Sequence, residues 1–214
     1  MSATDEKPSV FLVDDDPGVR TALTRGLTAE GFGVRSWESA DAFLREHEPD
    51  SPGCLVADVA MPGVDGLELQ TRLSLSGCDR PIVFVTGRGS IPMSVRAIRA
   101  GAVNFLSKPV RLEELVAAVR EALEQDRLIR FARARRALVQ ARLKLLTARE
   151  REVLDLVVAG RMNKQIAAEL GAAEKTIKVH RGRVMLKMQA RSVAELVTFT
   201  SQVAPRHAPA PTVE

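Results

Sequence analysis

Residues 54–66, CLVADVAMPGVDG, set four apolar residues directly before Asp58 and a turn of Met61, Pro62 and Gly63 just after it. A short apolar run bounded by turn residues is typical of a strand buried on both faces. Similar runs lie at 10–13, 33–37, 82–86 and 103–106, alternating with amphipathic stretches near 18–30, 39–47, 66–75, 91–100 and from 112 onward. This alternation predicts a doubly wound α/β domain with a five-stranded parallel sheet.

Polar residues follow four of these predicted strands at the point where each strand ends. They are Asp14 and Asp15, Asp58, Thr86, and Lys108. Ligands bind at the carboxyl ends of parallel strands, and in a sheet of order 2-1-3-4-5 these four strands are neighbours. The sequence therefore predicts that these side chains converge on one surface pocket.

The residue types in this pocket suit phosphoryl chemistry. Clustered carboxylates repel one another and need a cation, and Mg²⁺ takes oxygen ligands from few carboxylates. A carboxylate can attack phosphorus, while a lysine and a hydroxyl stabilise the transferred group. An unrelated set of turn and capping residues is the alternative, but four strand ends in order disfavour it.

The segments FLVDDD, LVADVAMPGVDG, IVFVTGRG and AVNFLSKP resemble the receiver domain of two-component response regulators, over about residues 8–125. This resemblance implies that Asp58 is the phosphoacceptor. It also implies that Asp14, Asp15, Asp58 and the backbone carbonyl of Ala60 hold Mg²⁺. Asp16 lies one place beyond the acidic pair and is interpreted as a turn residue.

The same resemblance assigns a switching role to three more residues. Thr86 would sense the phosphoryl group, Lys108 would pair with it, and Phe105 would change orientation on activation. Ordinary packing at the end of a strand is the alternative for Phe105.

Charge is distributed unevenly along the chain. The formal charge is −5 over residues 1–119 and +7 over residues 142–213. This asymmetry predicts that the N-terminal part binds cations and the C-terminal part binds polyanions. No apolar run approaches the ~18 residues of a membrane span, and the polar start MSATDEKPS resembles no secretory signal. We therefore expect a cytoplasmic protein without membrane contact, with Cys54 and Cys78 reduced and buried.

The domain boundaries follow from composition. We expect the receiver at 1–125, a helical linker at 126–143 that extends the fifth helix, a DNA-binding domain at 144–203 and a disordered tail at 204–214. Residues 110–159 contain no Gly or Pro, which favours a long connecting helix over a frayed linker.

The back half predicts a small bundle of helices. Thr147 with Glu150 forms a capping box before the first helix, and Asn163 can cap the second. The third helix spans about 174–188 and begins after Ala173, which has no capping hydroxyl. Ser192 with Glu195 forms a second capping box before the last helix.

The run LTAREREVLDLVVAGRMNKQIAAELGAAEKTIKVHRGRVMLKM resembles the LuxR-type helix-turn-helix domain, and the whole chain resembles the NarL/FixJ class, closest to its FixJ-like branch. Helix 174–188 would read the major groove, with Lys178 donating to guanine and Val179 touching a thymine methyl. Gly182 shares this face but has no side chain. The other predicted DNA-contacting residues are Lys164, Lys175, Thr176, Arg181, Arg183 and Lys187.

An apolar stripe on the last helix consists of Val193, Leu196, Val197 and Thr200. Packing within its own domain is one interpretation. The family resemblance implies a dimer contact instead, which would suit a pseudo-palindromic DNA site.

Together these features predict a response regulator transcription factor. Phosphotransfer from a sensor histidine kinase to Asp58 would control homodimerisation and binding of double-stranded DNA, activating transcription with RNA polymerase. Beyond chemistry on its own aspartate, no enzyme activity is expected.

Two alternatives stay open. One is a phosphorylation-independent DNA-binding regulator. The other is a Mg²⁺-dependent aspartyl phosphotransferase or phosphatase, which is disfavoured because Ala60 stands two residues after Asp58, where a second acid would be needed.

Overall fold

The computed structural model describes residues 9–87 and 89–203, so the predicted tail at 204–214 lies outside the described residues. The chain divides into two compact units, residues 1–130 and 131–214. Within the described ranges, none of the helices combines the length and the apolar character that crossing a membrane requires.

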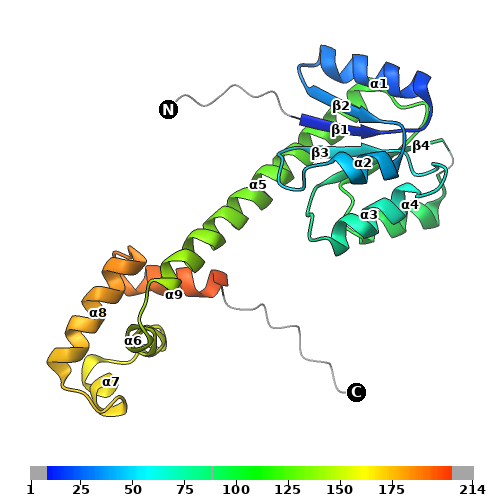
Figure 1. Ribbon diagram of the computed structural model, residues 1–214. Helices are drawn as coiled ribbons and strands as arrows, with labels where there is room; N and C mark the ends of the chain where they lie inside the picture. The colour runs from blue at the N-terminus through cyan, green and yellow to red at the C-terminus, as the bar shows by residue number, and fades with distance from the viewer. Residues whose placement is uncertain (1–8, 88, 204–214) are drawn as a thin grey trace, which may run out of the picture. The chain divides into compact units, whose positions relative to one another are not determined.

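A five-stranded parallel sheet of order β2-β1-β3-β4-β5 forms the centre of the first unit, as predicted (Figure 1). Its strands are β1 (Ser9–Val13), β2 (Gly33–Trp37), β3 (Cys54–Ala57), β4 (Ile82–Thr86) and β5 (Asn104–Ser107). β5 begins one residue later than expected, because Asn104 is the first residue in register with β4 and Val103 only donates its N–H to the carbonyl of Ile82.

Helices cover both faces of this sheet (Figure 1). They are α1 (Pro17–Ala29), α2 (Ala40–Glu46), α3 (Gly66–Leu75), α4 (Ile91–Arg99) and α5 (Leu112–Lys144). One core includes Leu27 of α1 and Leu115 of α5 packed on Leu12, and the other includes Phe43, Leu73 and Ala97 packed on Phe11. Cys54 and Cys78 are buried and unpaired, in agreement with the prediction.

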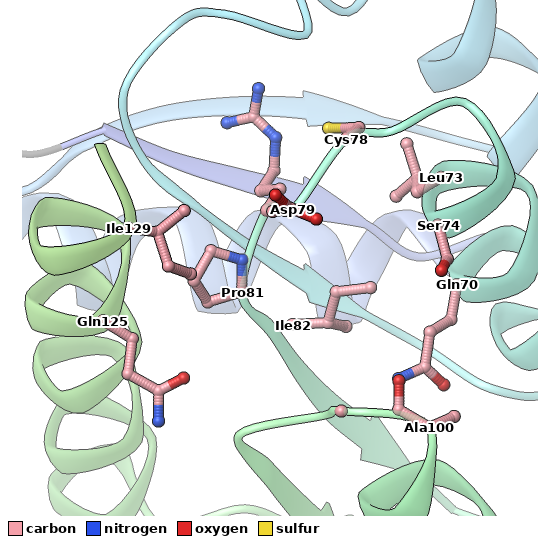
Figure 2. A pocket seen from close by; sticks show the side chains of 12 residues that line it. Gln70, Leu73, Ser74, Cys78, Asp79, Pro81, Ile82, Ala100, Gln125 and Ile129 are labelled. Carbon is pink, nitrogen blue, oxygen red and sulfur yellow. The ribbon is translucent and has the colours of Figure 1, made fainter. Parts of the chain in front are cut away.

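A hollow of about 270 Å³ lies at the amino end of β4, on the edge of the sheet opposite to the predicted pocket. Figure 2 shows Gln70 of α3 turned toward Ala100 there. The Gln70 amide donates to the carbonyl oxygens of Ala97 and Ala100, at 3.2 Å each. This buried side chain thus fastens α3 to the end of α4.

α5 is helical from Leu112 to Lys144, so the predicted linker at 126–143 is helix throughout and contains the division between the units. The rest of the second unit consists of α6 (Ala148–Val158), α7 (Asn163–Glu169), α8 (Glu174–Met188) and α9 (Val193–Val203). The core of this unit includes Val139 of α5 together with Leu154, Ile166, Ile177 and Leu196.

Local capping in the second unit differs from the prediction at two places. The Thr147–Glu150 box is present. Met162, not Asn163, is the N-cap of α7, because the Asn163 side chain accepts a hydrogen bond from Arg181 instead. The second box is half formed. Ser192 Oγ accepts from the Glu195 N–H, but the Glu195 carboxylate accepts from the backbone N–H of Arg191 and not from that of Ser192.

Candidate functional site

The predicted acidic pocket is assembled at the carboxyl ends of the strands. Asp14 follows β1 and Asp58 follows β3, and both are buried, whereas Asp15 is exposed. One carboxylate oxygen from each of the three lies within 4.8 Å of the others. Because hard divalent cations prefer oxygen ligands, these three residues fit a metal ion.

Lys108 reaches this pocket from the end of β5. Its Nζ lies 2.6 Å from Oδ2 of Asp14 and 2.6 Å from Oδ2 of Asp58. The Lys108 ammonium therefore bridges the two buried carboxylates and offsets their mutual repulsion.

At this bridge, burial and the neighbouring charges act in opposite directions on the pKa of Asp14 and on that of Lys108. Burial raises the pKa of Asp14, although the hydrogen bond and the charge of Lys108 act to lower it. Burial acts to lower the pKa of Lys108, but the hydrogen bonds to Asp14 and Asp58 outweigh it, so that pKa is raised. Lys108 consequently stays an ammonium at neutral pH, ready to pair with an anionic group.

Backbone amides hold both carboxylates in place. The Asp16 N–H donates to Oδ1 of Asp14 and the Ala60 N–H donates to Oδ1 of Asp58, at 3.0 Å each. Asp16 is the N-cap of α1, which agrees with its predicted turn role. The carbonyl of Ala60 as a metal ligand stays a prediction.

Thr86 and Phe105 lie beside the pocket on neighbouring strands. Thr86 ends β4 and is buried, and its carbonyl accepts from the Lys108 N–H at 2.8 Å. The half-buried Phe105 ring lies 6.2 Å from the Phe84 ring, centroid to centroid. A β-carbon added at Gly89 would lie 2.9 Å from Phe105 and 3.3 Å from Thr86, so this glycine passes close to both residues.

Arg20 is a residue of this site that sequence reasoning missed. Its Nη1 donates to the backbone carbonyl of Asp14 at 2.7 Å and approaches that of Asp15 at 3.4 Å. The only signal in the sequence is a lone arginine one turn into the first helix, which is too common to single out.

Helix α8, predicted to be the recognition helix that reads the major groove, exposes most of its predicted DNA-contacting residues to solvent. Ile177, Val184 and Met188 are buried in the core of the unit, whereas Leu186 is 78% exposed. The exposed predicted DNA contacts are Lys175, Thr176, Lys178, Val179, Gly182 and Arg183, together with Lys164 of α7.

Two other predicted DNA contacts have partners inside the second unit. Arg181 is half-buried and donates through Nη1 to Oδ1 of Asn163 at 3.0 Å. Lys187 Nζ lies 2.6 Å from Oε2 of Glu150. Lys187 is therefore held in an ion pair within its own unit, and its contact with DNA stays a prediction.

The predicted dimer stripe on α9 is divided between core and surface. Leu196 is fully buried in the core of its own unit, which fits the packing interpretation, and its contact with a second copy stays a prediction. Val193 is half-buried against the same core, and the Thr200 hydroxyl donates to the carbonyls of Leu196 and Val197. Only Val197, 40% exposed, offers an apolar side chain outward.

Comparisons with known proteins agree with both halves of this description. Residues 10–120 match the response regulator receiver domain family. Residues 144–200 match the luxR family of bacterial regulatory proteins. Nodulation protein W of Bradyrhizobium diazoefficiens is 48% identical over 194 residues, which cover 91% of this chain and 86% of that protein. The transcriptional regulatory protein FixJ of the same organism is 40% identical over 191 residues, covering 89% and 93%.

Solved structures give the same result. The response regulator StyR matches with a TM-score of 0.82 at 45% identity, over 92% of this chain and 99% of that chain. Full-length FixJ from B. japonicum matches with a TM-score of 0.57 at 39% identity, over 92% and 97%.

The sheet, its acidic pocket and the basic helix-turn-helix define a two-domain signalling protein. The chain belongs to the response regulators that join a receiver domain to a LuxR-type DNA-binding domain, and it is a response regulator transcription factor similar to FixJ and nodulation protein W. Membership in this family implies DNA binding and a histidine kinase as partner.

Proposed function

We propose that phosphotransfer from a histidine kinase to Asp58 controls dimerisation and sequence-specific DNA binding by this chain. The observation that carries the proposal is the Lys108 bridge, with 2.6 Å from its Nζ to a carboxylate oxygen of both Asp14 and Asp58. A cation held between an acceptor carboxylate and a second carboxylate is in position to pair with a group that adds negative charge at Asp58.

The transfer step uses the carboxylate of Asp58 as nucleophile. One of its oxygens bonds to the phosphorus of a phosphohistidine while the phosphorus–nitrogen bond breaks, and that electron pair returns to the imidazole nitrogen. Lys108 can then leave the Asp58 carboxylate and pair with a phosphoryl oxygen. The Ala60 N–H, already 3.0 Å from Oδ1 of Asp58, keeps the acceptor oriented.

Asp14, Asp15 and Asp58 would hold Mg²⁺ in this reaction, with the carbonyl of Ala60 as a further ligand. When bound, Mg²⁺ neutralises charge on the phosphoryl oxygens. The support for this assignment is the donor set itself, three carboxylates with one oxygen each inside 4.8 Å.

The added charge would draw Thr86 inward and change the packing of Phe105, shifting an equilibrium between two states of the receiver. The surface that changes would be the one formed by α4, β5 and α5. α4 carries Ile91, Val95 and Ile98 on one face at helical spacing, and all three are exposed, at 82%, 42% and 46%. An exposed apolar face of this kind suits a second copy of the receiver.

DNA binding by the dimer would activate transcription by bringing RNA polymerase to the promoter. We do not expect turnover of any added phosphomonoester, because Ala60 occupies the place where a second acid would be needed to protonate a leaving group.

Phosphorylation and DNA selection together test this proposal. The parent chain, Asp58→Asn and the exposed control Asp79→Asn are incubated with acetyl phosphate and Mg²⁺, and intact mass is recorded. We expect one added phosphoryl group on the parent and on the Asp79 variant but none on the Asp58 variant. Selection of bound DNA with and without beryllofluoride then gives the half-site and the effect on affinity. The mechanism would be refuted if Asp58→Asn were labelled by acetyl phosphate as the parent is. It would also be refuted if beryllofluoride changed the DNA affinity of Asp58→Asn as much as that of the parent.

The second candidate is a regulator whose DNA binding ignores phosphorylation. The intact set of Asp14, Asp58, Thr86 and Lys108 argues against it. It would be favoured by a parent chain that binds its selected site with equal affinity with and without beryllofluoride.

A further inference from the structure

Gly182 lies in the interior of α8, between Arg181 and Arg183. Glycine in the middle of a helix is unfavourable relative to alanine, because its backbone loses more conformational freedom on folding. A glycine at such a position therefore needs a reason in the folded domain or in a partner.

The folded domain supplies no such reason. The backbone of Gly182 is helical and outside the left-handed region, and a β-carbon built there would meet no heavy atom within 4 Å. Gly66 is the opposite case, since a β-carbon there would lie 2.4 Å from the carbonyl oxygen of Asp58. The domain itself would accept a side chain at Gly182.

The position of Gly182 points to the partner. Lys175, Lys178 and Val179 lie seven, four and three residues before it, so all four share one face of α8. Their side chains are exposed, and Val179 is 48% exposed despite being apolar. This face is the one that enters the major groove in helix-turn-helix proteins.

We propose that Gly182 determines DNA specificity through its missing side chain, which makes room for a thymine methyl group facing the helix. The proposal rests on the DNA-binding function of the second unit. The thymine methyl is the apolar group that base pairs project into the major groove. Val179 lies three residues before Gly182 on the same face, so its exposed apolar side chain would lie beside a methyl group that approaches the backbone of Gly182. Glycine is the residue that allows this close approach of backbone to ligand.

The test uses the full-length chain and the DNA site that selection yields for the parent. Gly182→Ala and Gly182→Ser are compared with Ser201→Thr, which adds one methyl group to an exposed position of α9. We expect Gly182→Ala to unfold at a higher temperature, to lose about tenfold or more in affinity for the selected site, and to bind random DNA as the parent does, since phosphate contacts carry that binding. The Ser201 variant should match the parent in each measurement.

Each thymine of the site is then replaced in turn by deoxyuridine, which lacks only the methyl group. At one position we expect the affinity loss of Gly182→Ala to shrink, because the added β-carbon no longer meets a methyl group. The proposal is overturned if Gly182→Ala binds the selected site as tightly as the parent, if it loses affinity for random DNA equally, or if no deoxyuridine substitution changes the loss. A parent chain that selects no DNA sequence would instead refute the DNA-binding function on which the proposal rests.

Discussion

The ammonium of Lys187 in α8 and the carboxylate of Glu150 in α6 form an ion pair, with 2.6 Å between Nζ and Oε2. Glu150 is almost completely buried, and its Oε2 also accepts the Thr147 N–H at 2.9 Å. The hydrogen bonds from Lys187 and then from Thr147 lower the pKa of Glu150 to about 2. One carboxylate thus completes the capping box of α6 and fixes the last turn of the recognition helix.

Replacing Glu150 by Gln should destabilise the second unit at neutral pH. Because the folded-state pKa, about 2, lies below the ordinary value of 4.5, the ionised pair adds stability that is complete above pH 4.5 and is lost as the pH falls toward 2. Unfolding temperatures of the parent and of Glu150→Gln should therefore converge over that interval. Glu152→Gln, which alters an exposed carboxylate paired with Arg149, should change little at any pH. A difference in unfolding temperature between the parent and Glu150→Gln that is the same at pH 7 and pH 3 would contradict this account.

Gly66→Ala should disturb Asp58, the proposed phosphoacceptor. The added β-carbon would lie 2.4 Å from the carbonyl oxygen of Asp58 and 2.9 Å from Cα of Val59, and these backbone atoms cannot turn away as a side chain would. We expect a loss of about 1–3 kcal/mol in receiver stability and slower labelling of Asp58 by acetyl phosphate. Gly87→Ala is the stability control, since its β-carbon would meet only Lys108 Cβ at 3.9 Å. Equal stability of the two variants would show that the backbone at Asp58 moves freely.

The acidic pocket was predictable because sheet order alone brings strand ends together. Once the alternation of strands and helices indicates a parallel sheet, residues that directly follow β1, β3 and β5 must share one edge, and Asp14, Asp58 and Lys108 do so. Arg20 was not predictable, because its contact depends on how one long side chain on α1 folds back over the strand end.

Predictions from local sequence, such as helix caps, failed where a residue distant in the sequence contacts the same side chain. Asn163 is a good helix cap by residue type, but Arg181, 18 residues later, takes its side-chain oxygen. The periodic stripe on α9 indicated an apolar face, but periodicity cannot say which neighbour covers it, and Leu196 turned out to be covered by its own unit.

Asn163→Ala should weaken DNA binding through Arg181. Oδ1 of Asn163 accepts a hydrogen bond from Nη1 of Arg181 at 3.0 Å and so orients the guanidinium of Arg181 on α8. Without this contact the arginine must be ordered on binding, at a cost of about 0.5–1.5 kcal/mol. We expect a loss of severalfold in affinity by fluorescence anisotropy, with an unchanged salt dependence because no phosphate contact is removed. In an Arg181→Ala background the same change should have no further effect, and an additive loss there would show that Asn163 acts independently.

Asp126 should hold α5 against the loop before β3. It is buried, and its Oδ2 accepts from the Gly53 N–H and from Arg130 Nε, both at 3.0 Å. Arg130 in turn donates to the carbonyl of Asp50. These contacts tie the last turns of α5 within the receiver to a loop on the edge of the sheet away from Asp58.

Asp126→Ala would leave the Gly53 N–H buried without an acceptor, which costs about 1–3 kcal/mol. Asp126→Asn keeps an acceptor for Gly53 but gives up the charge that faces Arg130, so its loss should be smaller. Both effects are measured by chemical unfolding of the receiver, together with hydrogen exchange at the Gly53 amide, which should be faster in the alanine variant. Glu124→Ala is the matched control, because it breaks an exposed pair with Arg127 one turn away on the same helix. If Asp126→Ala and Glu124→Ala were equally stable, the buried bond to Gly53 would not be what holds α5 in place.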